Sequence, residues 1–586
     1  MFKKVFLIII IIFSKIFSQS DFMTVFEKSG FVATSNYQET MNFFKLLDDS
    51  SEYAEFFDFG VSHQFRELKC LLVTKENRKL IDFNFSMGYK PTEKPIVLII
   101  NGIHSGEIEG KDASMLLLRE ILITKEKEYL LDSLNLLIIP IFNVDGHERK
   151  SKYNRINQNG PEEMGWRTNA LNLNLNRDWM KADAAEMQAM LSLFSTWLPD
   201  FIIDTHTTNG ADYQYEVTYQ IEKYQNIFWG TSDFLKNEFI PYLISNVEDK
   251  GFPIFDYVAL KEWDKGIESG LIDWVTPPRL STGYFALQNR PALLVETHML
   301  KPYKNRVYST KAVIETTLDF IYKNSTKIID LNFYADESAI SDFYQKNNFL
   351  PIKFKSTEQF DEVDFKGIEY YKEKSNISGS EKIVYTGKPK DFKLKFYRYH
   401  KTIDSVKVPR YYLIPIEYQE LIKRMQLHGI EINNTSRDTI LEVKKYRFKN
   451  VKFANKPYES RFIPSFDIEE FYEKVFIPKG TFVVSTNQRT LKVITNLLEP
   501  KSDDSFVKWG FMNSIFEQKE YFESYVMEKI AEEMLAKDYK LKEEFENKLK
   551  TDKDFRESAY ERLNFFYKNS PYWDKNLNVY PIMIIE

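Results

Sequence analysis

Histidine and carboxylate side chains stand at the ends of apolar segments in the first half of this 586-residue chain. His104 and Glu107 lie three residues apart, after the apolar run Ile96 to Ile100 and before a helical pattern. On a turn that leaves a strand, both side chains could point at one metal ion while the helix behind them fixes the backbone. His-x-x-Glu alone is a weak signal, because such pairs also occur by chance.

A third candidate ligand, His206, closes the apolar run Phe201 to His206, which we predict to be a strand. Ligands gather at the carboxyl ends of strands in open α/β sheets, so we expect His206 to meet His104 and Glu107 there. Three protein ligands leave the fourth position of a tetrahedral zinc ion open for water, as in catalytic rather than structural sites. Considered without these partners, His206 would more readily be a capped histidine at a strand end.

Arginine and asparagine side chains follow in the segment from Arg167 to Asp178. The planar fork of an arginine matches a carboxylate, and a neighbouring asparagine adds an amide donor. Asn176 and Arg177 could therefore hold a terminal carboxylate, while Arg167 faces the negative charge that develops on a carbonyl oxygen. The alternative is a polar surface loop without a ligand.

An acidic residue, Glu296, ends the apolar run Pro291 to Val295. A carboxylate at such a place is costly to bury unless it is paired or used. Beside a zinc-activated water it would serve as the proton acceptor. His298 follows two residues later, and we expect it to be a neighbour rather than a metal ligand.

Taken together and in this order, the four motifs resemble those of the zinc carboxypeptidases, or funnelins, in their bacterial branch. The resemblance covers roughly residues 25 to 320, and it implies peptide hydrolysis with one Zn²⁺ ion. It implies these roles for the matching residues: zinc ligation by His104, Glu107 and His206, water activation by Glu296, stabilisation of the carbonyl oxygen by Arg167, and binding of the substrate's free C-terminus by Asn176 and Arg177.

Two features depart from the family's pattern. Where well-studied members carry an Asp that supports a zinc-bound His, this chain has Asn174, whose neutral amide can still accept from an imidazole N–H. The family's mobile substrate-contacting Tyr has two candidates, Tyr257 and Tyr284. Side-chain preference is open as well: Arg279 would favour acidic terminal residues if it reached the pocket, and the alternative is a solvent-facing arginine.

The N-terminus has the pattern of a secretory signal, with Lys3 and Lys4 before nine apolar residues and a Ser18-Gln19-Ser20 stretch suited to cleavage. We therefore expect export to the periplasm or the extracellular space, with no transmembrane segment in the mature chain. The net charge of −6 argues against nucleic acid as a partner. Cys70 is the only cysteine, so an intramolecular disulfide is impossible, and its apolar surroundings predict a packed side chain.

The fold class predicted from the patterning is α/β, with a central mixed β-sheet flanked by helices, then a β-rich domain and a helical C-terminal segment. Strands are expected at residues 68–73, 95–101, 134–142, 200–206 and 292–298, and helices at 111–123 and 183–197. The expected boundaries are a signal peptide at 1–20, a catalytic domain at 21–330, a β-rich accessory domain at 331–505 and a helical segment at 506–586.

The leading hypothesis is a metallocarboxypeptidase that removes the C-terminal residue of peptides. A zinc amidohydrolase acting on peptidoglycan stem peptides or N-acyl amino acids would need the same metal and base. The alternative from another class is a non-catalytic exported binding protein. It would present the C-terminal β region to a glycan or protein partner. The sequence speaks against the last of these, because every residue that the chemistry needs is present.

Overall fold

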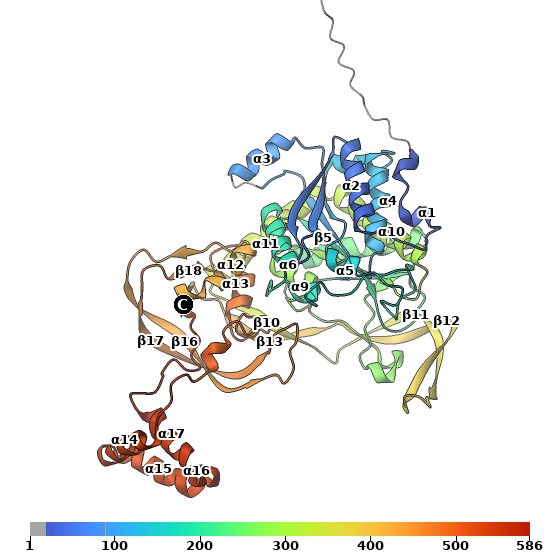
Figure 1. Cartoon of the computed structure of the whole chain (residues 1–586). Helices are drawn as coiled ribbons and strands as arrows, with labels where there is room; N and C mark the ends of the chain where they lie inside the picture. The colour runs from blue at the N-terminus through green and yellow to red at the C-terminus, as the bar shows by residue number, and fades with distance from the viewer. Residues whose placement is uncertain (1–18, 88–89, 225) are drawn as a thin grey trace, which may run out of the picture. The chain divides into compact units, whose positions relative to one another are not determined.

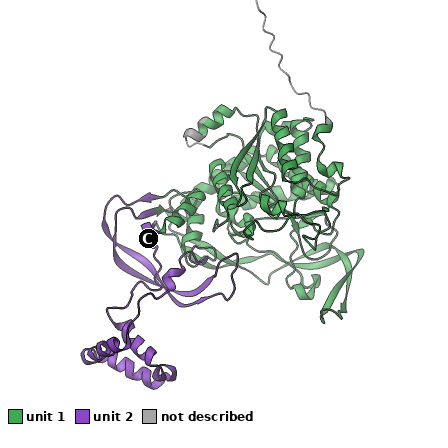
Figure 2. Cartoon of the chain, viewed as in Figure 1, with its two compact units in different colours: residues 1–410, 418–432, 484–505 green, residues 411–417, 433–483, 506–586 purple. Residues whose placement is uncertain are grey.

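The computed structural model describes residues 19–87, 90–224 and 226–586, so almost all of the predicted signal peptide lies outside the described residues. The chain forms two compact units (Figure 2). Unit 1 comprises Met1–Arg410, Tyr418–Ile432 and Val484–Ser505, and unit 2 comprises Tyr411–Glu417, Asn433–Val483 and Phe506–Glu586.

Unit 1 is built on a mixed eight-stranded sheet (Figure 1). In spatial order, its strands are β1 (Ala54–Val61), β2 (Glu67–Val73), β4 (Asn135–Ile139), β3 (Ile96–Asn101), β5 (Phe201–Thr208), β9 (Ala292–His298), β6 (Val217–Ile221) and β7 (Ile254–Asp256). The central strands β4, β3, β5 and β9 are parallel, whereas β6 runs antiparallel to β9. Every residue of β3, β5 and β9 is buried, which fits the apolar runs at residues 96–100, 201–203 and 292–295.

Helices flank this sheet. Those of unit 1 are α1 (Val25–Lys28), α2 (Tyr37–Ser50), α3 (Arg78–Met87), α4 (Glu109–Leu122), α5 (Val144–Glu148), α6 (Ala185–Trp197), α7 (Trp229–Phe234), α8 (Ile240–Asp249), α9 (Ser281–Leu287), α10 (Tyr303–Lys323), α11 (Ser325–Ala339), α12 (Gln419–Leu427) and α13 (Leu491–Leu498). Ile203 of β5 and Val295 of β9 pack into the main core together with side chains of α4, α8 and α10. Because neighbouring positions of a strand face opposite sides, His206 and Glu296 lie on the other face.

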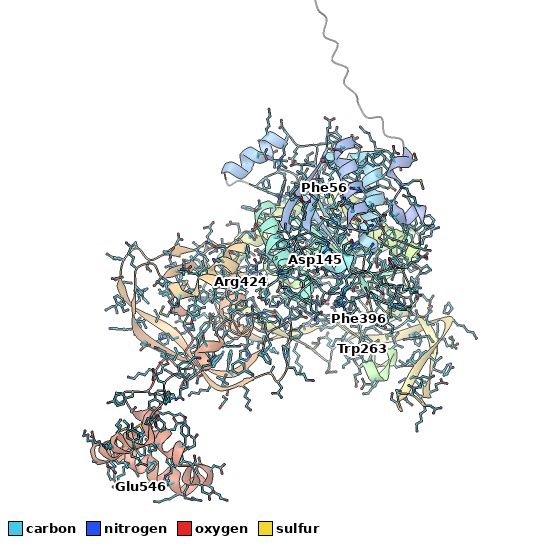
Figure 3. The ribbon with its side chains drawn as sticks, in the orientation of Figure 1. Phe56, Asp145, Trp263, Phe396, Arg424 and Glu546 are labelled. Atoms are coloured by element: carbon cyan, nitrogen blue, oxygen red, sulfur yellow. The ribbon has the colours of Figure 1, made fainter. Side chains whose placement is uncertain are left out.

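Further strands of unit 1 lie outside the large sheet. They are β8 (Leu271–Ile272), β10 (Phe349–Ser356), β11 (Asp361–Lys374), β12 (Glu381–Tyr397) and β13 (His400–Lys407). β10 pairs with β13, and the long hairpin β11–β12 pairs with β8. Phe396 of this hairpin, labelled in Figure 3, is buried in a cluster with Phe365 and Tyr215. The hairpin therefore shares a core with the segment that follows β5.

Unit 2 contains most of a six-stranded sheet and a helical cluster. Its strands, in spatial order, are β15 (Asn433–Asn434), β18 (Phe482–Ser485), β14 (Tyr411–Ile414), β19 (Met583–Ile585), β16 (Thr439–Phe453) and β17 (Pro464–Ile477). The helices α14 (Ser524–Lys537), α15 (Tyr539–Thr551), α16 (Lys553–Glu557) and α17 (Ala559–Asn569) share a small core of their own that includes Met527 and Phe566.

The predicted fold class is confirmed: a mixed sheet with helices is followed by β-rich segments and then by C-terminal helices. Cys70 is buried in β2 without a disulfide, as its apolar surroundings predicted. Among the described residues, no helix combines the length and the apolarity that crossing a membrane requires.

Candidate active site

The turn between β3 and α4 carries two of the predicted ligands. Gly102 has φ +68°, and a Cβ added there would meet the side chain of Ile108 at 2.8 Å, so a glycine is needed for the chain to leave the strand in this direction. The backbone N–H of Glu107 then donates to the carbonyl of His104 at 2.8 Å. This closed turn places both side chains next to each other.

The three predicted ligands converge. His206 lies near the end of β5, beside β3, and the ligand atoms of His104, Glu107 and His206 all lie within 4.8 Å of one another. Nδ1 of His104 lies 3.1 Å and Nδ1 of His206 2.8 Å from the same oxygen, Oε2 of Glu107. All three residues are buried, with at most 4% of their surface exposed. Two imidazoles and one carboxylate are a ligand set that suits zinc.

Hydrogen bonds around His104 show that this site suits a cation. Oδ1 of Asn174 accepts from the backbone N–H of Asn176 at 3.0 Å, so the atom that lies 3.0 Å from Nε2 of His104 is an oxygen, and Nε2 must donate to it. Burial lowers the pKa of His104 to about 4, so the ring is neutral at pH 7 and its Nδ1 carries a lone pair. That lone pair faces the carboxylate of Glu107, and a metal ion between them would satisfy both.

Glu296 lies beside these ligands. It pairs in register with His206 across the parallel strands β5 and β9, and it is buried. Its Oε2 has no hydrogen-bond partner among the described residues. Burial raises the pKa of this carboxyl to about 8, and the negative charges of Glu107 and Asp204 act in the same direction. Such a carboxylate is placed to exchange protons with a small molecule at the three ligands.

Comparison with known proteins gives the same assignment. Residues 41–220 match the family model described as zinc carboxypeptidase. Curated relatives include Carboxypeptidase 2 of Trichophyton rubrum and of Trichophyton tonsurans, each 20% identical to this chain. Both alignments cover 75% of this chain, and they cover 79% of the T. rubrum protein and 78% of the T. tonsurans protein. Residues 41–220 therefore form a zinc carboxypeptidase domain.

Solved structures similar to this zinc carboxypeptidase include two bacterial enzymes. The metallo-carboxypeptidase from Burkholderia cenocepacia is 15% identical, with a TM-score of 0.37 over 50% of this chain and 70% of that chain. The metallo-carboxypeptidase from Pseudomonas aeruginosa, in complex with (2-guanidinoethylmercapto)succinic acid, is also 15% identical, with a TM-score of 0.37 over 51% of this chain and 70% of that chain.

The segment that carries the predicted substrate clamp of the carboxypeptidase is also ordered by hydrogen bonds. Oδ1 of Asn176 accepts from the backbone N–H of Ser281 at 2.9 Å and from Nε1 of Trp179 at 3.2 Å. These bonds fix the amide so that its Nδ2 remains the atom for an external acceptor. Arg177 donates through Nη1 to the carbonyl of Asn176 at 2.6 Å. The amide donor of Asn176 and the guanidinium of Arg177 thus lie on adjacent residues of one ordered segment.

Two arginines contact the other oxygen of Glu107. Nη2 of Arg155 lies 2.6 Å and Nη1 of Arg167 3.2 Å from Oε1. Arg167 was identified from the sequence, whereas Arg155 was not, because it lies in an irregular loop and belongs to no motif. The more exposed Arg167 is the one that can turn toward a substrate, since 37% of its side chain is accessible against 10% for Arg155.

A second residue that the sequence analysis missed is Asp204. Its Oδ2 lies 3.1 Å from Nε2 of His206, the ring nitrogen that does not face Glu107. The signal was present in the sequence: Asp204 and His206 stand two positions apart on a predicted strand, so their side chains share one face. His298 pairs through Nε2 with Asp212 at 2.9 Å, in agreement with its expected place outside the ligand set.

The structure distinguishes the two tyrosine candidates. The hydroxyl of Tyr284 is buried against Nδ1 of His428 at 2.9 Å. Tyr257 lies close enough to the site that, after burial itself, the charge of Glu296 is the next influence that raises its pKa. Tyr257 is therefore the better candidate for contact with a substrate.

Arg279 is neither a solvent-facing arginine nor directed to the metal site, because its side chain is paired and only 22% exposed. Its Nε pairs with Oδ1 of Asp504 at 2.9 Å, and its Nη2 donates to the carbonyl of Asp503 at 3.3 Å. The side chain is thus engaged with the segment after α13. A preference for acidic terminal residues finds no support in this position.

Proposed function

We propose that this zinc carboxypeptidase binds one zinc ion through His104, Glu107 and His206 and removes the last residue of peptides that have a free C-terminus. The observation that supports this most is the convergence of both Nδ1 atoms on Oε2 of Glu107. At His104, whose ring is neutral at pH 7, a lone pair that faces a carboxylate is unfavourable without a cation between them. Glu296 lies beside this triad in register with His206, and its Oε2, which has no hydrogen-bond partner among the described residues, is available to accept from a water molecule.

The chemistry follows from this arrangement. Zinc held by these residues supplies a Lewis acid that lowers the pKa of a water to about 7 and polarises the scissile carbonyl. Glu296 accepts a proton from the water as its oxygen adds to the carbonyl carbon, and it delivers that proton to the leaving amine nitrogen as the C–N bond breaks. Burial, which raises the pKa of this carboxyl, makes it a better proton acceptor. The products are a shortened peptide and a free amino acid.

The neighbouring cationic and amide groups are assigned to the substrate. Asn176 and Arg177 bind the terminal carboxylate, because an amide donor and a guanidinium fork match its two oxygens. Arg167 stabilises the negative charge that develops on the carbonyl oxygen. For this it exchanges the contact with Oε1 of Glu107 for the substrate, while Arg155 remains on that oxygen.

A substrate comparison tests this function. The zinc-loaded protein is offered matched peptides with a free or an amidated C-terminus, together with purified peptidoglycan stem peptides, and released amino acid is measured. Release of the last residue from free-acid peptides, with at least a tenfold lower rate for amides, is expected. Release from stem peptides only would favour the amidohydrolase, and no release from any substrate would leave a binding protein.

We also propose that the chain is exported. The support is the basic, apolar and small-residue pattern of residues 1–20. Mass spectrometry of the protein from its native cells should find a mature N-terminus near residue 21, in the periplasmic or extracellular fraction. An intact Met1 in the cytoplasm would rule this proposal out.

A further inference from the structure

A completely buried carboxylate stands behind one of the zinc ligands. Asp204 has no exposed surface, and its Oδ2 lies 3.1 Å from Nε2 of His206. Nδ1 of the same ring is the atom that faces Glu107. A carboxylate thus lies close to each ring nitrogen of His206, and these two contacts restrict how the imidazole can turn.

Ser281 holds this carboxylate in place. It is the first residue of α9, and its Oγ donates to Oδ2 of Asp204 at 2.6 Å. The backbone N–H of Ser281 donates to Oδ1 of Asn176 at 2.9 Å. One buried residue thus contacts both the support of a zinc ligand and the amide of the substrate clamp.

The two histidine ligands have different partners. Nε2 of His104 donates to the neutral amide of Asn174, whereas Nε2 of His206 lies against a carboxylate. A carboxylate behind an imidazole makes the ring a stronger electron donor to a metal than an amide does. A buried carboxylate is also costly unless it is used, and Oδ1 of Asp204 has no hydrogen-bond partner among the described residues.

We infer that Asp204, through its ion-pair contact with Nε2, is the positioning residue for the zinc ligand His206, and that the hydrogen bonds of Ser281 join this carboxylate to Asn176 of the substrate clamp. The inference rests on the proposed function, because it assigns His206 to the metal. The charged residue behind a zinc ligand is therefore Asp204 on β5, two residues before His206. The residue behind the other histidine ligand, Asn174, is neutral.

Zinc affinity, measured by competition with a chromophoric chelator, is the first test. Asp204→Asn keeps the shape but removes the charge, and it should weaken zinc binding by about 10- to 100-fold. Ser281→Ala removes only the Oγ bond to Asp204, so a smaller loss in the same direction is expected. Asn174→Asp is the matched variant on the other histidine, and it should not weaken zinc binding. Thermal unfolding of each zinc-free variant shows that it is folded.

Kinetics with a free-acid peptide at saturating zinc give a second readout. Both Asp204→Asn and Ser281→Ala should lower kcat with KM within about twofold, because the backbone N–H of Ser281 still orders Asn176. A purely structural role would instead lower the unfolding temperature and leave zinc affinity unchanged.

The outcomes separate this inference from the proposed function. If the native protein binds no zinc in a one-to-one ratio, the proposed function fails. If the native protein binds zinc and cleaves peptides, while folded Asp204→Asn and Ser281→Ala bind zinc as tightly as the native protein, only the positioning role of Asp204 is overturned.

Discussion

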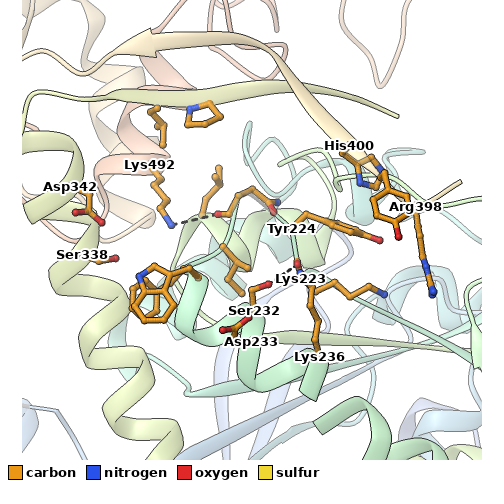
Figure 4. Close-up of a pocket in the computed structure, with 18 of the residues that line it drawn as sticks. Lys223, Tyr224, Ser232, Asp233, Lys236, Ser338, Asp342, Arg398, His400 and Lys492 are labelled. Atoms are coloured by element: carbon orange, nitrogen blue, oxygen red, sulfur yellow. Dashed lines mark hydrogen bonds between the residues drawn. The ribbon is translucent and has the colours of Figure 1, made fainter. Parts of the chain in front are cut away.

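Unit 1 offers two places for a small molecule, at opposite edges of its large sheet. The three metal-binding candidates and Glu296 lie at the carboxyl ends of the neighbouring strands β3, β5 and β9. A cavity of about 830 Å³ is lined by residues that follow β6, among them Lys223, Tyr224 and Trp229 (Figure 4). Since β6 runs antiparallel to β9, with Ile221 opposite Leu293, the chain after β6 leaves the sheet at the amino end of β9.

The two places differ in how their polar groups are arranged. In the metal site each ligand is held by a second polar group: Asn174, Arg155 or Asp204. In the cavity, cations and acids occur together but do not converge on one point. Lys223 pairs with Asp256 at 3.1 Å and Arg398 with Asp361 at 2.6 Å. The convergent site is the one with identifiable chemistry, so a large cavity is by itself a poor guide to function.

The largest expected effect is at Glu296. Replacement by Gln removes the proton acceptor and keeps the shape, so kcat should fall by about 10²- to 10⁴-fold. Zinc content, measured by atomic emission on the purified variant, should stay near one ion per chain because Glu296 is no ligand. Persistent turnover in this variant would show that another group acts as the base. The chemistry assigned to the metal site, which distinguishes it from the cavity, would then be wrong.

A smaller effect is expected at the substrate clamp. Arg177→Ala should lower kcat/KM for a free-acid peptide by roughly 10- to 100-fold, because a charged hydrogen bond to the terminal carboxylate is lost. The same peptide with an amidated C-terminus provides the control, since its poor turnover should not fall further. An equal loss for both peptides would mean that Arg177 acts on something other than the terminal carboxylate.

The strands that position the site could be predicted because they are buried on both faces. β3 and the first halves of β5 and β9 are apolar runs, and His104, His206 and Glu296 stand shortly after these runs, so the motifs mark the ends of predictable strands. Arg155 could not be predicted, because a loop with no periodic pattern brings it to Glu107 from 48 residues away. Its own φ of +56° gives no sequence signal either.

The roles of Arg279 and Asp204 depend on contacts in the folded protein that local sequence patterns do not reveal. Arg279 lies within a segment that the sequence analysis connected with the substrate pocket, but its partner, Asp504, stands more than two hundred residues later. Asp204 was overlooked for the opposite reason, since it stands inside an apolar run that was interpreted only as a strand. Spacing along a strand is therefore informative only when both faces are considered.

In the cavity, the informative residue is Lys492. It is buried in the first turn of α13, and its Nζ donates to the carbonyl of Asn226 at 3.5 Å. Burial lowers its pKa to about 8, against about 10.4 for a lysine in an unfolded chain. The folded state therefore binds fewer protons between pH 8 and 10.4, so this lysine destabilises the fold fully below pH 8 and progressively less as pH rises.

Lys492→Met should accordingly stabilise the protein at pH 7 by about 1 to 3 kcal/mol. The gain should shrink toward zero between pH 8 and 10.4, as measured by urea unfolding of both proteins at each pH. Lys236→Met, at an exposed position of the same cavity wall, is the matched control and should change stability by less than about 0.5 kcal/mol. Destabilisation by Lys492→Met at pH 7 would show that an ion pair stabilises the charged lysine in the folded protein.

The smallest effect is predicted for Trp229, whose side chain lies at the cavity and is largely exposed. Trp229→Ala removes apolar surface from the cavity and no group of the metal site. Because the two places lie at opposite sheet edges, kcat/KM for a free-acid peptide should stay within about twofold of the native value. Steady-state kinetics would decide this, with zinc content measured in parallel. A tenfold loss at unchanged zinc content would mean that the cavity takes part in substrate binding, and the separation argued above would be wrong.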